Sequence, residues 1–221
     1  LNSQGISVSI GNKTMADVVR LWKEGIIVAI KGIGGYLLTC DANNKDVISL
    51  LRNRKHRPDK PFAVMYPDLK SLKKELRVSP KEQTELQSVN APIIILDIND
   101  KSKVSLDIDS IAPRLNSIGA MLPYTPLFDL LLSVFNKPII ATSGNVSGSP
   151  IIFEDKQALE ELLGIADYLL TNNRDIVVPQ DDSVVRFSTQ NQQRIIIRRS
   201  RGLSPVYINP KIKRSPENIF A

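Results

Sequence analysis

The chain has 221 residues, with 29 Lys and Arg against 23 Asp and Glu, and it contains one Cys and one His. This length suits one large α/β domain or two small ones, and 42% hydrophobic with 24% charged residues is typical of a globular protein. With only Cys40 and His56 available, a disulfide framework is excluded and a Cys/His zinc site is not expected. No apolar run approaches the roughly 18 residues of a membrane span, and the N-terminus lacks a signal-peptide pattern. Because Cys is scarce, we expect a reducing, cytoplasmic setting.

Helices and strands alternate along the first half of the chain. A helical pattern with a cap-like Thr14 stops at Gly25, and the β-branched run at 26–30 is predicted to be a buried strand. Ser79 and Glu82 form a capping-box pattern with Pro at the first helical position. In chain order, this half is predicted to contain a helix at 14–22, strands at 26–30 and 36–39, a helix at 44–51, a strand at 62–65, and helices at 68–77 and from 80 onward.

The second half is richer in strands. Its predicted elements are strands at 93–96 and 118–122, a helix at 127–134, a strand at 139–142, a helix at 154–163, and strands at 168–170, 183–187 and 194–197. Residues 102–114 show no convincing period. Alternation followed by a strand-rich end is typical of a mixed α/β sheet in one domain.

Basic charge gathers at the C-terminal end. Residues 1–193 carry 22 basic and 22 acidic groups, whereas seven basic groups and a single acidic one follow from Arg194 onward. Arg198, Arg199 and Arg201 directly follow a predicted strand, a place where basic side chains commonly meet an anionic ligand. Residues 208–221 are expected to form a linker or a frayed tail.

The glycine-rich segment from Lys31 to Tyr36 follows the first predicted strand. Its three glycines permit positive φ and let a ligand approach the backbone closely. It is not a P-loop, because no Gly-Lys-Ser/Thr follows. It is not a dinucleotide fingerprint either, because its glycine spacing differs and a strand follows. A tight turn without a ligand is an equal alternative.

The segment 52–61 carries five basic residues and one acidic residue between a helix and a strand. Its two prolines stiffen the backbone and fix the directions of the side chains. Guanidinium and ammonium groups on a stiff loop suit phosphate oxygens, so phosphate binding is favoured over a merely solvated charge run. His56 is interpreted as a bystander.

Two further segments carry polar groups at strand boundaries. Thr142, Ser143 and Asn145 follow a predicted strand together with two glycines, which suits either the orientation of a polar ligand or an ordinary turn. Asp181 and Asp182 precede a predicted strand, where they suit Mg²⁺ binding, acid–base chemistry or a turn.

Six segments, taken in order, resemble one known family. They are KGIGGYLLTCDA, RKHRPDKPFAVM, MLPYTPL, TSGNVSG, DDSVVR and RRSRG. Together they resemble the YrdC-like domain of HypF-type carbamoyltransferases of hydrogenase maturation, from about residue 15 to 205. Free-standing YrdC proteins, which make threonylcarbamoyl-adenylate for tRNA modification, usually have Thr residues where this chain has Gly32 and Gly34. They also usually carry an Arg-x-Pro pattern where this chain reads Met-Leu-Pro, and both departures favour the HypF branch.

The resemblance implies a YrdC-like twisted mixed α/β sheet with helices and a concave basic face. The implied domain spans 14–207, with 1–13 as an extension or linker and 208–221 as a tail, cut from a larger enzyme. Its implied reaction joins carbamate, derived from carbamoyl phosphate, to the α-phosphate of ATP, forming carbamoyl-adenylate for the maturation of nickel–iron hydrogenase. Fixed cations stabilise the developing charge in such a reaction, and no covalent nucleophile is needed, so Cys40 is assigned to packing.

The resemblance also implies site residues and partners. Lys55 and Arg57 are the implied catalytic residues, contacting the phosphates or the carbamoyl group. The implied nucleotide- and carbamoyl-binding residues are Lys31, Gly34, Lys60, Thr142, Ser143, Asn145, Ser183, Arg199 and Arg201. ATP is expected as a substrate with Mg²⁺, whose protein ligand is not assigned, and no zinc is expected. The implied partners are the remaining domains of the full-length enzyme and a HypE-type maturation protein.

Two alternatives remain open from the sequence. One is a free-standing threonylcarbamoyl-adenylate synthase, which threonine-dependent pyrophosphate release would identify. The other is a non-catalytic RNA-binding module, which the charge balance of residues 1–193 and the 5% aromatic content argue against.

Overall fold

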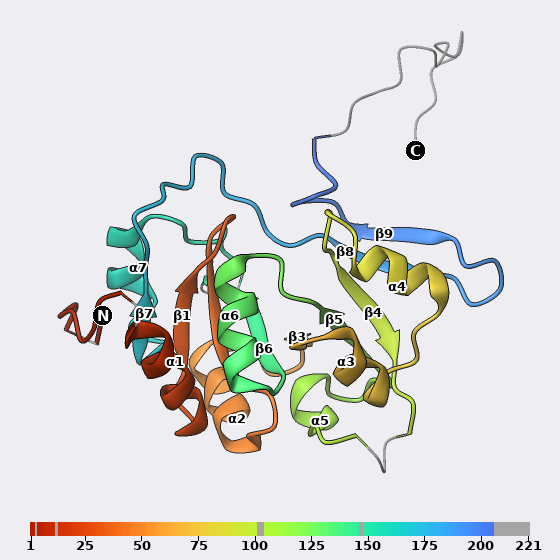
Figure 1. Cartoon of the computed structure of the whole chain (residues 1–221), viewed down its shortest axis with the longest axis horizontal. Helices are drawn as coiled ribbons and strands as arrows, with labels where there is room; N and C mark the ends of the chain where they lie inside the picture. The colour runs from red at the N-terminus through yellow and green to blue at the C-terminus, as the bar shows by residue number, and fades with distance from the viewer. Residues whose placement is uncertain (3, 12, 101–103, 146–147, 206–221) are drawn as a thin grey trace, which may run out of the picture.

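A computed structural model describes residues 1–205, apart from 3, 12, 101–103 and 146–147. The predicted tail at 208–221 lies outside the described residues. Nine strands form one mixed sheet in the order β7-β1-β2-β6-β3-β5-β4-β8-β9. The pairs β1–β7, β3–β5 and β4–β8 are parallel, and the other neighbours are antiparallel. The predicted fold class is therefore confirmed (Figure 1).

The strands are short and mostly apolar, and β4, β6, β8 and β9 contain runs of β-branched residues. They are β1 Val28–Lys31, β2 Tyr36–Asp41, β3 Ala63–Met65, β4 Ile93–Asp97, β5 Ser117–Met121, β6 Ile139–Ser143, β7 Tyr168–Leu170, β8 Val184–Phe187 and β9 Arg194–Arg198. The predicted strand at 26–30 begins two residues late, because the Ile26 N–H closes the end of the preceding helix on Leu21 O. The strand predicted at 62–65 begins at Ala63, because the Phe62 N–H bonds to Ile111 O.

Helices cover both faces of the sheet. They are α1 Lys13–Lys23, α2 Lys45–Arg54, α3 Leu69–Glu75, α4 Pro80–Leu86, α5 Ile108–Ile111, α6 Pro126–Phe135 and α7 Asp155–Glu161. One apolar core contains Trp22 of α1 and Phe128 of α6, and the other contains buried residues of α2, α3, α4, α5 and α7. Figure 1 shows α1 and α6 side by side over β1 and β6. The aperiodic stretch 102–114 contains the short helix α5, whose single turn is too brief to show a period.

Hydrogen bonds from capping side chains explain where α2 and α4 begin. Asn44 accepts the backbone N–H groups of Asp46 and Val47, so α2 starts there. The capping box of Ser79 and Glu82 is present at α4, as predicted.

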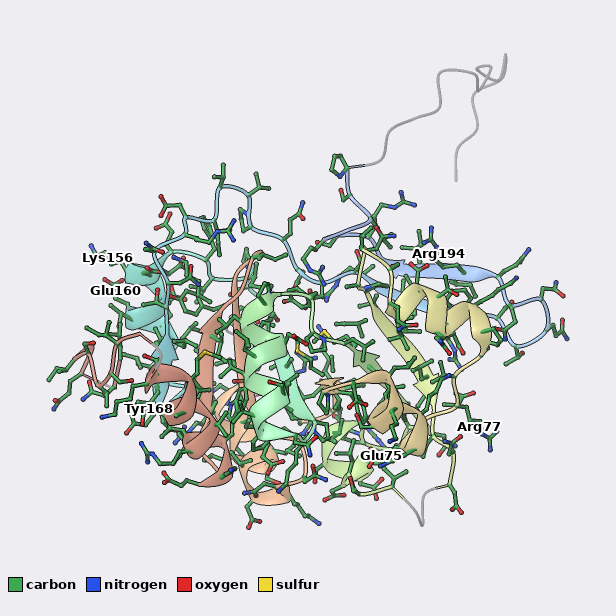
Figure 2. The ribbon with its side chains drawn as sticks, in the orientation of Figure 1. Glu75, Arg77, Lys156, Glu160, Tyr168 and Arg194 are labelled. Carbon is green, nitrogen blue, oxygen red and sulfur yellow. The ribbon has the colours of Figure 1, made fainter. Side chains whose placement is uncertain are left out.

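The β8–β9 hairpin is held onto α4 by the Arg194–Glu85 ion pair at 2.9 Å, on the side of the molecule where Figure 2 labels Arg194. Among the described residues, no helix is long and apolar enough to cross a membrane.

Candidate functional site

Small residues hollow out one face of the sheet. Ala63 of β3 lies opposite Gly119 of β5 on one side and Ala141 of β6 on the other, so three neighbouring strands lack bulk in one row. Ile95 continues the row on β4. These residues form the floor of a cavity of about 550 Å³. Its polar lining is Lys55, Arg57, Lys60, Thr142, Ser143, Asn145, Ser149, Asp181, Asp182 and Arg198.

Lys55 joins two segments that are far apart in the sequence. It follows the last turn of α2, and only 1% of its surface is exposed. Its Nζ donates to Ser143 O, Asn145 O and Asn145 Oδ1, each at 2.7 Å. An ammonium has three hydrogens, so these three bonds use its full donor capacity. The 52–61 and 142–145 segments, both of which were assigned to the site from the sequence, therefore meet at one cavity, and Lys55 connects them.

Burial and a neighbouring cation act on the ionisation of Lys55. Desolvation is the larger cause and the nearby Arg57 the next, and together they lower the pKa of Lys55 to about 7. The side chain therefore titrates near neutral pH. A change in its protonation alters the donors that it offers to the 143–145 segment.

We expect this titration to appear in stability. The pKa of Lys55 is about 7 in the folded chain against the ordinary 10.5, so unfolding takes up a proton between these pH values. The free energy of unfolding therefore rises with pH across this interval. Between pH 7 and pH 9 the wild type should gain about 2 kcal/mol relative to Lys55→Met. Urea unfolding of both proteins at the two pH values measures this, and parallel pH profiles would contradict it.

Arg57 and Lys60 bring positive charge to the cavity. The Arg57 guanidinium donates to Thr142 Oγ1 at 3.3 Å, Lys60 O at 3.2 Å and Pro61 O at 2.5 Å. Burial, followed by the nearby Arg52 and Arg198, lowers the pKa of Arg57 to about 10, so it stays charged at neutral pH. Lys60 is exposed at the cavity edge. The predicted basic loop therefore lines the cavity.

The 142–145 segment forms the adjoining wall of the cavity. The Ser143 hydroxyl donates to Asn145 Oδ1 at 2.9 Å, and the Asn145 amide donates to Ser149 O. Thr142 is buried and turns its hydroxyl toward Arg57. Val146 and Ser147, which belong to the predicted motif, lie outside the part of the chain that the structure describes. Thr142, Ser143 and Asn145 all line the cavity, and their implied role in nucleotide and carbamoyl binding stays a prediction.

The C-terminal arginines divide into different roles. Arg198, which the sequence marked as a basic residue after a predicted strand but which was not assigned to the site, lines the cavity and pairs with Asp181 at 3.2 Å. Arg201 is buried against Asp182 at 2.9 Å and stacks over Tyr124 at 3.8 Å. Arg199 is exposed. Neither Arg199 nor Arg201 is among the residues that line the cavity, and the expectation that one of them closes the site stays a prediction. The available indication for Arg198 was its place directly after the predicted strand at 194–197.

Ser183 is not itself among the residues that line the cavity, although its neighbours Asp182 and Val184 are. Its side chain is fully buried, and its hydroxyl accepts the Ser200 N–H at 2.8 Å. This bond holds the chain after β9 against the start of β8. The hydroxyl therefore faces the neighbouring backbone, and the expected phosphate contact stays a prediction.

The glycine-rich turn serves packing in this structure. A Cβ on Gly34 would lie 2.2 Å from Gln180 O, and the Gln180 N–H bonds to Gly34 O at 2.8 Å. Lys31 is buried and pairs with Asp155 at 2.7 Å. Lys31 and Gly34 are thus not among the residues that line this cavity, and their expected ligand contacts stay predictions. The turn instead supports the segment that carries Asp181 to the cavity wall.

A family model described as Telomere recombination, covering the Sua5, YciO and YrdC proteins, matches residues 20–200. The chain belongs to the Sua5/YciO/YrdC family. It is 42% identical, over 92% of its length, to carbamoyltransferase HypF of Synechocystis, of which it covers 26%. A crystal structure of full-length HypF in the phosphate- and nucleotide-bound form is 45% identical with a TM-score of 0.82, covering 86% of this chain and 29% of that one.

The predicted resemblance to the HypF branch is confirmed. Threonylcarbamoyl-AMP synthase of Vibrio campbellii is more distant, at 27% identity over 68% of this chain and 82% of that protein. The chain spans about a quarter of the length of the Synechocystis HypF that it matches. It therefore corresponds to the YrdC-like part of those longer carbamoyltransferases.

Proposed function

We propose that this chain is the adenylating domain of a HypF-type carbamoyltransferase. Water would hydrolyse carbamoyl phosphate to carbamate and inorganic phosphate. A carbamate oxygen would then attack the α-phosphorus of ATP, and the bond to the β-phosphate would break, which gives carbamoyl-adenylate and pyrophosphate. The observation that supports this most is the cavity of about 550 Å³ that gathers Arg57, Lys60 and Arg198 around a floor of small residues. Volumes of this order hold ligands of nucleotide size.

The chemistry asked of the site is charge stabilisation. Negative charge shifts onto the leaving phosphates, and preorganised cations in a partly enclosed site stabilise it more than water does. Arg57 follows α2 and Arg198 is the last residue of β9, so two segments that are far apart in the sequence each bring a guanidinium to the cavity. Lys55 would act mainly by holding the 143–145 wall, because its three donors are engaged there.

Mg²⁺ is proposed to enter with ATP. This ion keeps several waters and is usually held by substrate phosphates plus one or two carboxylates. Asp181 and Asp182 are the carboxylates that line the cavity, and Asp182 is engaged by Arg201. Asp181 is therefore the carboxylate better placed to share the ion, at the expense of its pair with Arg198.

The decisive experiment is pyrophosphate exchange into ATP. We expect exchange that depends on carbamoyl phosphate and none that depends on threonine with bicarbonate. Exchange that depends on threonine with bicarbonate, and not on carbamoyl phosphate, would instead assign the chain to the tRNA-modification branch. Binding of RNA that falls steeply with salt, without nucleotide turnover, would favour the RNA-binding alternative. The domains of the longer relatives, a HypE-type partner and a cytoplasmic role in nickel–iron hydrogenase maturation are part of the same proposal.

Replacing Arg57 by alanine is expected to weaken ATP binding about 10- to 100-fold, because a charge-assisted contact to phosphate is lost. The free energy of unfolding should fall by only about 1 kcal/mol, since the guanidinium also donates to the Pro61 and Lys60 carbonyls. Arg114→Ala is the matched control, because Arg114 is exposed and pairs with Asp59 at 2.7 Å. Titration calorimetry and urea unfolding measure both effects. Unchanged ATP affinity in Arg57→Ala would contradict the assignment.

A further inference from the structure

Arg52, in the last turn of α2, gathers the carbonyl groups of two separate segments. Its Nη1 lies 2.5 Å from Arg57 O and 3.1 Å from both Pro58 O and Lys60 O. Its Nη2 donates to Ser110 O at 2.7 Å and to Ile111 O at 3.2 Å. One guanidinium therefore contacts five backbone oxygens.

These contacts hold the backbone of the basic loop at 57–61 through its carbonyl groups. The Arg52 guanidinium lies 4.5 Å from the centre of the Phe62 ring, and the Phe62 N–H bonds to Ile111 O. The loop at 57–61 is thus bound at both its start and its end to α2 and to the end of α5. Such multiple bonds to one planar group define the loop's orientation more narrowly than single contacts would.

The orientation matters for an anion in the cavity. Carbonyl oxygens carry partial negative charge, and three of the loop's carbonyls are turned onto Arg52. Arg57 and Lys60, from the same loop, line the cavity. Arg52 itself is not a cavity residue, so its action on a ligand must pass through the loop. The arrangement presents the cations of the loop to the cavity while its carbonyls are held by a half-buried guanidinium.

We infer that Arg52 is a positioning residue for phosphate binding, which holds the 57–61 loop so that Arg57 and Lys60 meet the polyphosphate of a nucleotide. This rests on the proposed function, from which it takes the nucleotide as ligand. The role is distinct from simple stabilisation, because it predicts a loss that is specific to the phosphates of the ligand. Adenosine, which lacks phosphate, tests that distinction.

The test compares Arg52→Gln and Arg52→Lys with a control in the same helical turn. Arg54→Gln is that control, since Arg54 is also half-buried and donates to Ile165 O and Asp167, away from the cavity. Calorimetry gives the dissociation constants of ATP, pyrophosphate and adenosine, and thermal unfolding reports stability. Arg52→Lys keeps the charge but has three donors for the five oxygens.

We expect Arg52→Gln to raise the dissociation constants of ATP and pyrophosphate by about 10-fold or more, with adenosine unchanged. Arg52→Lys should fall between this variant and the wild type, and it serves as the test if Arg52→Gln does not fold. Arg54→Gln should leave all three constants unchanged whatever it does to the melting temperature. Equal losses for ATP and adenosine, or none, in the Arg52 variants would overturn the inference.

The two proposals fail separately. A wild-type chain that binds ATP and pyrophosphate but shows no carbamoyl-phosphate-dependent exchange would overturn the proposed function, while the Arg52 comparison would still decide the positioning role. A wild-type chain that binds neither ATP nor pyrophosphate would overturn both.

Discussion

Lys55→Met is expected to lower the free energy of unfolding by about 3 kcal/mol near pH 7 and to abolish measurable ATP binding. Methionine fills a similar space but leaves Ser143 O, Asn145 O and Asn145 Oδ1 without the donor that now lies 2.7 Å from each. A buried acceptor that loses its partner destabilises a fold by about 1–3 kcal/mol, and relaxation of the segment offsets part of the sum. The 143–145 wall would then lose its attachment to the basic loop. Urea unfolding and calorimetry with ATP measure the two effects.

Lys60→Met is the matched control for this prediction. Lys60 lies five residues along the same loop and lines the same cavity, but it is exposed. Removing it should weaken ATP binding by about 10-fold or less and leave stability within about 0.5 kcal/mol. If Lys55→Met and Lys60→Met behaved alike in unfolding, the tie between the two segments would not contribute to the fold as described.

Gly34→Ala should disrupt the cavity wall from outside the cavity. The added methyl group would lie 2.2 Å from Gln180 O and 3.1 Å from Gln180 C, and both atoms belong to the backbone, so the chain itself must move. Overpacking of this kind destabilises by about 1–3 kcal/mol. Asp181 is the next residue, and its pair with Arg198 at 3.2 Å should be lost with the shift. We expect ATP affinity to fall at least about 10-fold together with the melting temperature.

Gly164→Ala provides the comparison for this variant. A Cβ at Gly164 would meet only Glu161 O, at 3.9 Å, which is an ordinary contact. Its stability and ATP affinity should remain near those of the wild type. Wild-type ATP affinity in Gly34→Ala would show that the 180–182 segment does not depend on the turn.

The secondary structure could be predicted closely, because most elements carry their own local cause. Helix α4 begins at a capping box that four consecutive residues define, and β6 is an apolar run that needs no distant partner to be recognised. Two strands begin later than predicted, because the residues before them bond to other elements. Ile26 closes the end of α1. The Phe62 N–H donates to Ile111 O at the end of α5, and no local sequence pattern predicts this contact.

The candidate site could be predicted in part. The basic loop and the 142–145 segment were recognisable as ligand-binding types, since stiff cations and small polar groups sit at element ends. The roles within them were not recognisable. Arg52 and Arg57 belong to one charge run, yet one contacts carbonyls beneath the loop and the other lines the cavity.

The amino-acid sequence by itself determined the order of helices and strands, the mixed α/β class and the two polar segments, because apolar periodicity, caps and glycine positions are local properties. Only the tertiary structure decided which side chains share the cavity. Lys55 meets Asn145 across 90 residues of chain, and Arg198 reaches the cavity while Arg201 is buried against Asp182. These outcomes depend on strand order and register. The local sequence does not indicate which of Arg198 and Arg201, three positions apart, will face the cavity.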